Sequence, residues 1–256
     1  MSDLSADGAL IAANIETVKQ RMAAACARVG RAPESVTLLP VTKTVPAERL
    51  RAAYAAGGLR RCGENKVQEA REKAEALADL GLSWSVIGHL QTNKAKYVAR
   101  FADAFHALDS LKLAEALERR LEVEGRTLDV FIQVNTSGEE SKFGLEPSAA
   151  PAFARALAPF ERLKVRGLMT LAIFSAEEAA VRACFRRLRA VQAEIRDGVP
   201  DAQVDELSMG MSGDFEWAIE EGATLVRVGQ AIFGPRPLPD EHYWPGLGGK
   251  REKETP

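Results

Sequence analysis

The sequence predicts a single (β/α)₈ barrel of the TIM type, preceded by an extra N-terminal helix. Short apolar runs alternate eight times with helical patterns over a length of about 250 residues, which suits such a barrel. Turns that suit an anion follow the seventh and eighth runs, where these barrels commonly bind phosphate. An open doubly wound sheet is the alternative. It would need a glycine fingerprint after its first strand, where this chain has Lys-Thr-Val-Pro at 43–46.

The first element is an amphipathic helix, because apolar residues recur at helical spacing from Leu10 to Val29, and Gly30 and Pro33 end it. The predicted strands are Val36–Thr42, Leu59–Gly63, Trp84–Gly88, Ala104–Leu108, Leu128–Val134, Val165–Thr170, Val204–Ser208 and Leu225–Val228. The predicted helices between them are Ala47–Ala56, Lys66–Leu80, Asn93–Arg100, Ser110–Glu124, Ser148–Phe160, Glu177–Arg196 and Gly213–Glu221. Because crossover helices return the chain in the same direction, these strands should pair in parallel.

Two features set the limits of this prediction. Pro40 lies inside the first strand although it has no N–H to donate to a neighbour, and we expect a β-bulge to accommodate it. The barrel domain is expected to cover residues 1–234. Residues 235–256 are rich in proline, glycine and charge, and we expect them to form a loosely ordered C-terminal tail.

Composition excludes several classes of function. The net charge of −2 provides no basic field for nucleic acid. No apolar stretch reaches the roughly 18 residues that a membrane helix needs, and the first residues do not resemble a signal peptide. Cys26, Cys62 and Cys184 are widely spaced and odd in number, which predicts neither a disulfide framework nor a zinc site. A cytoplasmic protein without metal is therefore expected.

Polar and glycine residues lie at the predicted carboxyl ends of the strands, which in a barrel face one shared cavity. Lys43 follows the first strand, and Asn65 follows the second. The candidates after the seventh and eighth strands are Met209, Ser212, Gly213, Arg227, Gly229 and Gln230.

Lys43 is the candidate for covalent chemistry. A lysine at the end of a buried strand is costly to place unless the site needs an amine, and a neutral lysine amine can form a Schiff base with an aldehyde. A cation such as Arg227 near Lys43 would lower the pKa of the amine toward this reactive state. The alternative is a lysine whose charged end simply extends to solvent.

The turns after the last two strands are candidates for binding phosphate. Ser212 is expected at the N-cap of a helix that begins near Gly213, where its hydroxyl and the following N–H groups can bind an anion. Gly229 allows close approach of the backbone, and Gln230 can donate its N–H. Simple helix capping and a simple turn are the alternatives. An amine opposite a phosphate site suggests pyridoxal 5′-phosphate as the cofactor.

Two further charged residues bear on the chemistry. Arg227, facing a pyridine nitrogen, would keep that nitrogen unprotonated and so disfavour the electron-sink chemistry of most enzymes that use this cofactor. A salt-bridged structural arginine is the alternative. Lys142, after the fifth strand, could reach over the cavity as a second amine, or it could be a solvated loop lysine.

Motifs in order along the chain resemble those of the pyridoxal phosphate homeostasis protein family, which is similar to the barrel domain of bacterial alanine racemase. The matching stretches are Val41–Thr44, Gly63–Asn65, Ile87–Lys94, Val134–Glu139, Lys142–Gly144, Gly167–Thr170, Leu207–Asp214 and Val226–Gly234. The resemblance implies a barrel that carries pyridoxal phosphate on Lys43. It also implies phosphate contacts at Ser212, Gly213, Gly229 and Gln230, a contact of Arg227 with the ring nitrogen, and Asn65 and Met209 near the ring.

The same resemblance implies a protein that buffers or delivers the cofactor and influences amino-acid and keto-acid balance. We expect it to be a monomer, with pyridoxal-phosphate-dependent apo-enzymes as partners. A slow racemase or decarboxylase is the alternative. Racemisation needs a second acid–base group, which in the racemases is a tyrosine of the partner chain, whereas Tyr54 and Tyr97 lie on predicted outer helices and Tyr243 in the tail. A sugar-phosphate enzyme that forms an imine on Lys43 is a third possibility.

Overall fold

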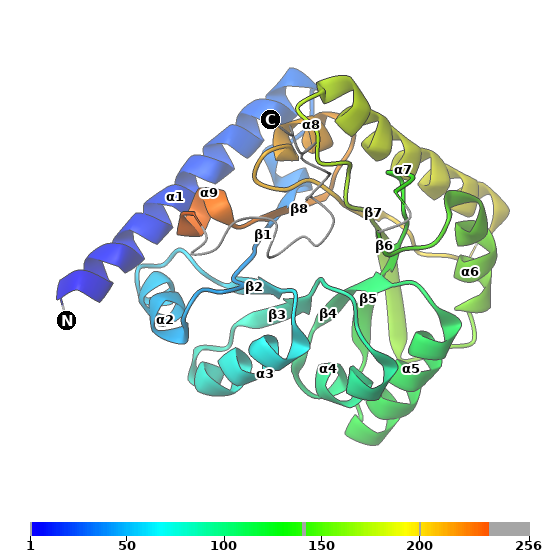
Figure 1. Cartoon of the computed structure of the whole chain (residues 1–256), viewed down its shortest axis with the longest axis horizontal. Coiled ribbons are helices and arrows are strands. Elements are labelled where there is room, and N and C mark those ends of the chain that lie inside the picture. The colour runs from blue at the N-terminus through cyan, green and yellow to red at the C-terminus, as the bar shows by residue number, and fades with distance from the viewer. Residues whose placement is uncertain (1, 140–141, 200, 236–256) are drawn as a thin grey trace, which may run out of the picture.

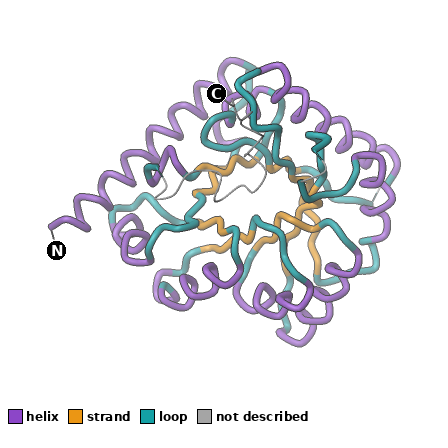
Figure 2. Tube along the Cα trace, viewed as in Figure 1, coloured by secondary structure: helices purple, strands orange, loops and turns teal. Residues whose placement is uncertain are grey.

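Eight parallel strands form a nearly closed barrel inside a ring of helices, in a computed structural model that describes residues 2–139, 142–199 and 201–235 (Figures 1 and 2). The strands are β1 Thr37–Pro40, β2 Arg61–Glu64, β3 Ser83–Val86, β4 Ala104–Leu108, β5 Leu128–Gln133, β6 Leu163–Met169, β7 Glu206–Ser208 and β8 Leu225–Val228. The α-helices are α1 Ser2–Arg28, α2 Ala47–Ala55, α3 Val67–Ala76, α4 Ala95–Phe101, α5 Leu111–Glu124, α6 Ala150–Ala156, α7 Glu178–Gly198, α8 Phe215–Glu220 and α9 Gln230–Phe233.

The predicted barrel with its extra N-terminal helix is confirmed, and each predicted strand overlaps an observed one. Some observed strands are shorter than predicted, because the apolar run is longer than the hydrogen-bonded ladder. The strand β1, for example, ends at Pro40 rather than at Thr42. The predicted helix Lys66–Leu80 divides into α3 and a short 3₁₀ helix at Ala78–Leu80. The predicted tail falls almost entirely on residues 236–256, outside the described residues.

The barrel closes at a seam between β1 and β2, where the only pairing in the described chain is a bridge between Val41 and Gly63. Pro40 pairs with Val228 of β8 without a register shift, so the expected β-bulge at Pro40 is wrong. Val41 donates its N–H to Val228 O (2.8 Å), whereas Thr42 donates to Gly63 O (2.9 Å). Since successive residues of a strand alternate in direction, the nitrogen of Pro40 faces the seam, and its missing hydrogen costs no bond with β8.

The long helix α1 lies outside the barrel, beside α2, α8 and α9 (Figure 1). Its apolar stripe is buried as the periodicity predicts, including Ile11, Ile15 and Val18. Gly8 lets α1 touch α2, because a Cβ at this position would lie 2.5 Å from Ala52 O. The helix therefore packs over the elements that carry the first and last turns of the barrel.

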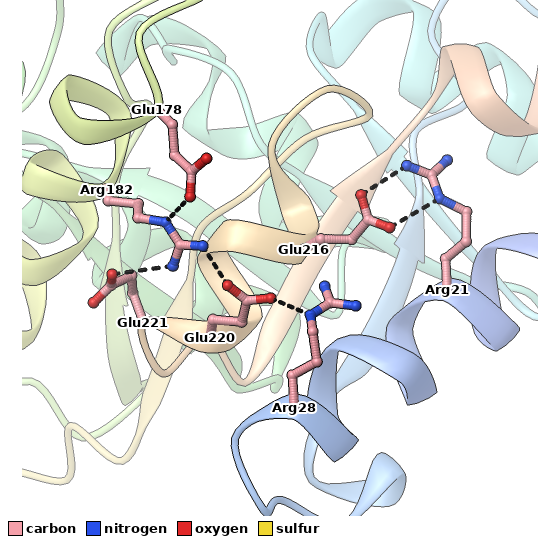
Figure 3. A network of polar contacts seen from close by, with 7 residues as sticks. All are labelled: Arg21, Arg28, Glu178, Arg182, Glu216, Glu220 and Glu221. Carbon is pink, nitrogen blue, oxygen red and sulfur yellow. Dashed lines mark hydrogen bonds and ion pairs between the residues drawn. The ribbon is translucent and has the colours of Figure 1, made fainter.

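An ion-pair network ties α1 and α7 to α8 (Figure 3). Arg21 makes a two-pronged contact with Glu216 (3.2 and 2.9 Å), and Arg28 binds Glu220 (2.6 Å). Arg182 of α7 also binds Glu220. Single pairs of this exposure contribute little stability, but a connected set restricts the geometry of α8 and hence of the loop that precedes it.

Within the described ranges, the helices are all too short or too polar to span a lipid bilayer.

Gly167 offers a direct test of the register between β6 and β7. A Cβ at this position would lie 1.8 Å from Glu206 O, which belongs to the backbone of the neighbouring strand and cannot rotate away. We predict that Gly167→Ala lowers the free energy of unfolding by about 3 kcal/mol or more, measured by urea denaturation. Gly198→Ala is the matched control, because a Cβ added at this last residue of α7 would have no atom within 4 Å. Equal stability of the two variants would contradict the register.

Candidate functional site

The first and last turns of the barrel line one cavity of about 60 Å³. Lys43 and Thr44 contribute from the segment after β1, and Gly229, Gln230 and Phe233 from the segment after β8. These turns are neighbours because β1 pairs with β8. The predicted juxtaposition of the amine with the glycine turn after the eighth strand is therefore present in the structure.

The turn that carries Lys43 is strained. Thr44 has φ +67°, and it is the single non-glycine residue with positive φ in the part of the chain that the structure describes. This conformation is a genuine outlier for a β-branched residue and costs on the order of 1–2 kcal/mol. Lys43 itself is half-buried. Strain of this kind persists only where surrounding contacts hold it, and it concentrates at functional positions.

The loop after β7 follows a fixed path. Gly210 has φ +96°, and a Cβ there would lie 2.6 Å from the Cβ of Ala218. The carbonyl of Gly210 accepts the N–H of Arg227 (2.9 Å), and Met211 donates its N–H to Asp214 Oδ1 (2.5 Å). These bonds set the position of Ser212 and Gly213 in the middle of the loop.

The expected role of Ser212 as an N-cap is wrong. The helix α8 begins at Phe215, and Asp214 stands at its N-cap, where its side chain accepts the N–H of Met211 rather than an N–H of the helix. Ser212 Oγ instead accepts the N–H groups of Gly229 (3.2 Å) and Ala231 (3.4 Å).

This contact joins the two predicted phosphate turns into one surface. Gly229 cannot carry a side chain without crowding the first strand, since its Cβ would lie 3.2 Å from Val41 O. Gly213 is exposed, and no atom lies within 4 Å of its added Cβ. Converging backbone N–H groups are suited to an anion, which would replace Ser212 Oγ as their acceptor. The contact of Ala231 with Ser212 was not predicted from the sequence. The only indication in the sequence is that Ala231 closely follows Gly229.

Arg227 lies in the barrel interior, with only 3% of its surface exposed. Its guanidinium donates to Ser208 Oγ (2.7 Å) and to Thr170 O (2.8 Å), from β7 and from the end of β6. Burial lowers the pKa of Arg227 to about 10, and nearby Asp214 opposes this change. Arg227 therefore remains a cation at neutral pH, fixed in orientation by two acceptors.

His106 continues this polar chain and was not identified from the sequence. Its Nδ1 lies 3.0 Å from Ser208 Oγ, and its ring stacks on Phe131 at 4.2 Å. Burial, and secondarily the charge of Arg227, lower the pKa of His106 to about 3. The ring is thus neutral at pH 7. Because Ser208 accepts from Arg227, its own hydroxyl hydrogen is available to donate to His106 Nδ1.

Two other predicted site residues lie apart from the cavity at Lys43. Met209 is fully buried directly after β7, and its N–H bonds to Leu225 O (3.1 Å). Asn65 is half-buried directly after β2, and a Cβ at Gly88 would lie 2.3 Å from Asn65 O. Among the described residues, the predicted site residues that line that cavity are Lys43, Gly229 and Gln230; Ser212, Gly213 and Arg227, like Asn65 and Met209, are not part of its lining.

The ammonium group of Lys142 is engaged with the rim of the barrel. It donates to Ala172 O (2.9 Å), after β6, and pairs with the carboxylate of Glu139. Beside it, Phe143 is exposed and stacks on His89 at 4.1 Å. These contacts favour the interpretation of Lys142 as a loop residue.

Several other residues considered in the sequence lie away from the cavity at Lys43. Within the described ranges, no cluster of histidine, cysteine and acidic side chains could hold a metal ion. Burial raises the pKa of Cys62 to about 12, so its thiol is not a nucleophile at neutral pH. Tyr54 and Tyr97 lie on the outer helices α2 and α4, each beneath an arginine. Tyr243 lies outside the described residues.

Comparison with known proteins gives a consistent family. Residues 7–237 match the family described as "Alanine racemase, N-terminal domain". A protein of Pseudomonas aeruginosa is 46% identical over 226 residues, which cover 88% of this chain and 96% of that protein. A protein of Escherichia coli K12 is 40% identical over 229 residues, covering 88% and 97%. Both are named "Pyridoxal phosphate homeostasis protein".

Solved structures agree. A protein of Bifidobacterium adolescentis has a TM-score of 0.83 and 38% identity over 89% of this chain and 96% of its own. PipY of Synechococcus elongatus, in a structure with PLP bound, has a TM-score of 0.74 and 38% identity over 83% of this chain and all of its own. Alanine racemase of Corynebacterium glutamicum shares the fold, with a TM-score of 0.63 and 16% identity over 90% of this chain and 62% of its own.

The buried histidine predicts a specific acid sensitivity. The unfolded chain protonates His106 near pH 6.5, whereas the folded chain does so only near pH 3, so its contribution to stability is present above pH 6.5 and is lost as the pH falls. We predict that His106→Asn removes about 1.4 kcal/mol per pH unit from the pH dependence of the unfolding free energy between about pH 6 and 4. Urea titrations measure this slope. A His106→Asn protein with the same slope as the wild type would show that His106 is not held neutral.

Proposed function

The chain belongs to the alanine racemase N-terminal domain family and, within it, to the pyridoxal phosphate homeostasis proteins, and from this premise we propose that it binds pyridoxal 5′-phosphate through a Schiff base on Lys43. The observation that carries the proposal is that Lys43, Gly229 and Gln230 line the same cavity. An aldehyde that also bears a phosphate needs an amine and an anion site on one cavity, and these residues meet that requirement.

Each predicted residue has a place in this proposal. Ser212, Gly213, Gly229 and Gln230 hold the phosphate, since the contact between Ser212 and Gly229 makes the two turns one surface. The ligand reported for PipY is the same cofactor. The bound cofactor would supply a reactive aldehyde and an aromatic ring, with Asn65 and Met209 near the ring.

Arg227 makes the site chemically quiet. Its guanidinium is a cation at neutral pH, and Ser208 and Thr170 fix its orientation. A cation facing the pyridine nitrogen disfavours protonation of that nitrogen, and the unprotonated ring is a weak electron sink. The cofactor is therefore held with little tendency to drive chemistry at an amino-acid Cα.

The proposed role is intracellular homeostasis of the cofactor. The protein buffers pyridoxal phosphate in the cytoplasm and delivers it to pyridoxal-phosphate-dependent apo-enzymes, which influences amino-acid and keto-acid balance. Catalysis is not part of this role. Tyr54 and Tyr97 lie on outer helices, and without a second positioned acid–base group proton exchange loses on the order of 10²–10⁴ in rate. The proposed working unit is a monomer, because one chain supplies both the amine and the phosphate turns.

Replacing the anchoring amine tests the proposal. We predict that Lys43→Ala abolishes the visible absorbance of the Schiff base and the covalent adduct that borohydride reduction fixes, because the described residues that line the cavity include no other lysine. Absorbance spectra and peptide mass spectrometry of the reduced protein measure both. Some non-covalent binding should remain, since the phosphate turns are intact.

Lys142→Ala is the matched control, because it removes an amine that is engaged on the rim. It should keep the wild-type absorbance and adduct. A Lys43→Ala protein that stays yellow and reducible would contradict the proposal and direct attention to Lys142.

Turnover separates the carrier from a slow racemase or decarboxylase. We predict rates below about 1 s⁻¹, a low value for an enzyme, when the loaded protein is incubated with D- or L-amino acids, because the described lining of the cavity includes no tyrosine to act as the second acid–base group. Chiral chromatography and detection of released CO₂ measure the two reactions. Faster turnover of any amino acid would show that the protein is an enzyme.

A further inference from the structure

A buried charged cluster lies behind the turn that carries Lys43. The side chain of Glu64 at the end of β2 is completely buried, and that of Lys73 in α3 is 9% exposed. Glu69, one turn before Lys73 in α3, is 27% exposed. Buried charges are costly unless they are paired and hydrogen-bonded, so this arrangement needs a reason.

Lys73 uses all three of its ammonium hydrogens. Nζ donates to Glu64 Oε1 (2.8 Å), to Glu69 Oε1 (2.6 Å) and to the backbone carbonyl of Thr42 (2.7 Å). Thr42 is bound a second time, because its hydroxyl donates to Glu64 Oε1 (2.6 Å). The residue immediately before Lys43 is thus fixed through both its carbonyl and its side chain.

The residue immediately after Lys43 is fixed by the same cluster. Thr44, in its left-handed conformation at φ +67°, donates its N–H to Glu69 Oε1 (2.6 Å). That oxygen also accepts from Lys73, so one carboxylate connects the strained turn to the buried cation. A short hydrogen bond to a charged acceptor is among the stronger ones, and it can offset the strain at Thr44.

Glu69 is the critical carboxylate of the three-residue cluster at neutral pH. Burial raises the pKa of Glu64 to about 7, and the attraction of Lys73 opposes this change only in part. Burial thus disfavours the charged form of Glu64, whereas Glu69 is partly exposed and its Oε1 lies 2.6 Å from Lys73 Nζ. Glu69 is also the member that touches Thr44.

We propose that Glu69 and Lys73, with Glu64, are positioning residues that hold the backbone on both sides of Lys43 so that its amine stays at the cavity and is ready to react with an aldehyde. The inference rests on the proposed function of Lys43. It assigns a role to α3, an outer helix that lines no part of that cavity within the described residues. A network that served only global stability would not need hydrogen bonds to Thr42 and Thr44, the two residues that flank Lys43.

Glu69→Ala tests the proposal, with Glu75→Ala as the matched control. Glu75 lies on the same helix, is exposed, and pairs only loosely with Arg71 at 3.6 Å. We expect Glu69→Ala to slow Schiff-base formation with pyridoxal phosphate by roughly tenfold or more, because misplacing a reacting group by about 1 Å can cost as much as a hundredfold in rate. Stopped-flow absorbance measures the rate. Glu75→Ala should react as fast as the wild type.

A second readout needs no cofactor. Hydrogen exchange at the Thr44 amide should be slow in the wild type, because this N–H is bound to Glu69, and fast in Glu69→Ala. Glu69→Gln keeps an oxygen acceptor for the amide, so it should retain protection at Thr44 and most of the reaction rate. If Glu69→Ala fails to fold, the test uses Glu69→Gln, which is expected to keep slow hydrogen exchange at the Thr44 amide. A glutamine variant that loses both properties would overturn the proposal.

Thr44→Gly should rescue Glu69→Ala, because glycine adopts positive φ without strain. The double variant is expected to recover at least part of the lost rate, while a purely global defect would not respond to a change at Thr44. No recovery would overturn the proposal.

The two hypotheses fail in different ways. If the wild type forms no adduct on Lys43, the proposed function itself is wrong. If the wild type forms the adduct and Glu69→Ala reacts equally fast, the function stands and the positioning role is wrong.

Discussion

The pairing of β1 with β8 is the constraint on which the site depends. It places the first turn of the barrel beside the last, although Lys43 and Gly229 are far apart in the sequence. Pro40 does not weaken this pairing, because its nitrogen faces β2 rather than β8. The hydrogen bond from Val41 N–H to Val228 O is therefore kept. The two turns then pack so closely that a side chain at position 229 would crowd Val41. An amine and a set of backbone donors meet at one cavity as a result.

The barrel contains two buried polar systems that are built differently. In the barrel interior, His106, Ser208 and Arg227 form a chain in which one permanent cation is bound by neutral partners. Behind the first turn, Lys73 and Glu69 form a charged pair that reaches the backbone next to Lys43. The first system fixes a charge that restrains the chemistry of a bound ring. The second holds a strained turn and thereby an amine. Both use burial to limit the conformations of a functional group.

The barrel could be predicted from the sequence because its signal is repetitive: apolar runs and helical stripes alternate eight times, and small boundary errors do not change the topology. Lys43, Gly229 and Gln230 could be placed on one cavity because residues at the strand ends of a barrel share one face. The contacts of Ser212 could not be predicted, because its partners Gly229 and Ala231 come from a different loop. Thr44 carries no sequence signal, because threonine disfavours positive φ. His106 and Lys73 are visible as polar residues near apolar runs, but their partners depend on register and helix packing.

The central claim is that one ligand bridges the amine after β1 and the N–H groups after β8. A crystal structure of the protein soaked with pyridoxal 5′-phosphate tests it most directly. The account predicts continuous electron density from Lys43 Nζ to the cofactor, with phosphate oxygens at about 3 Å from the backbone nitrogens of Gly229 and Gln230. Density for the cofactor on another lysine, or with its phosphate away from these turns, would contradict it.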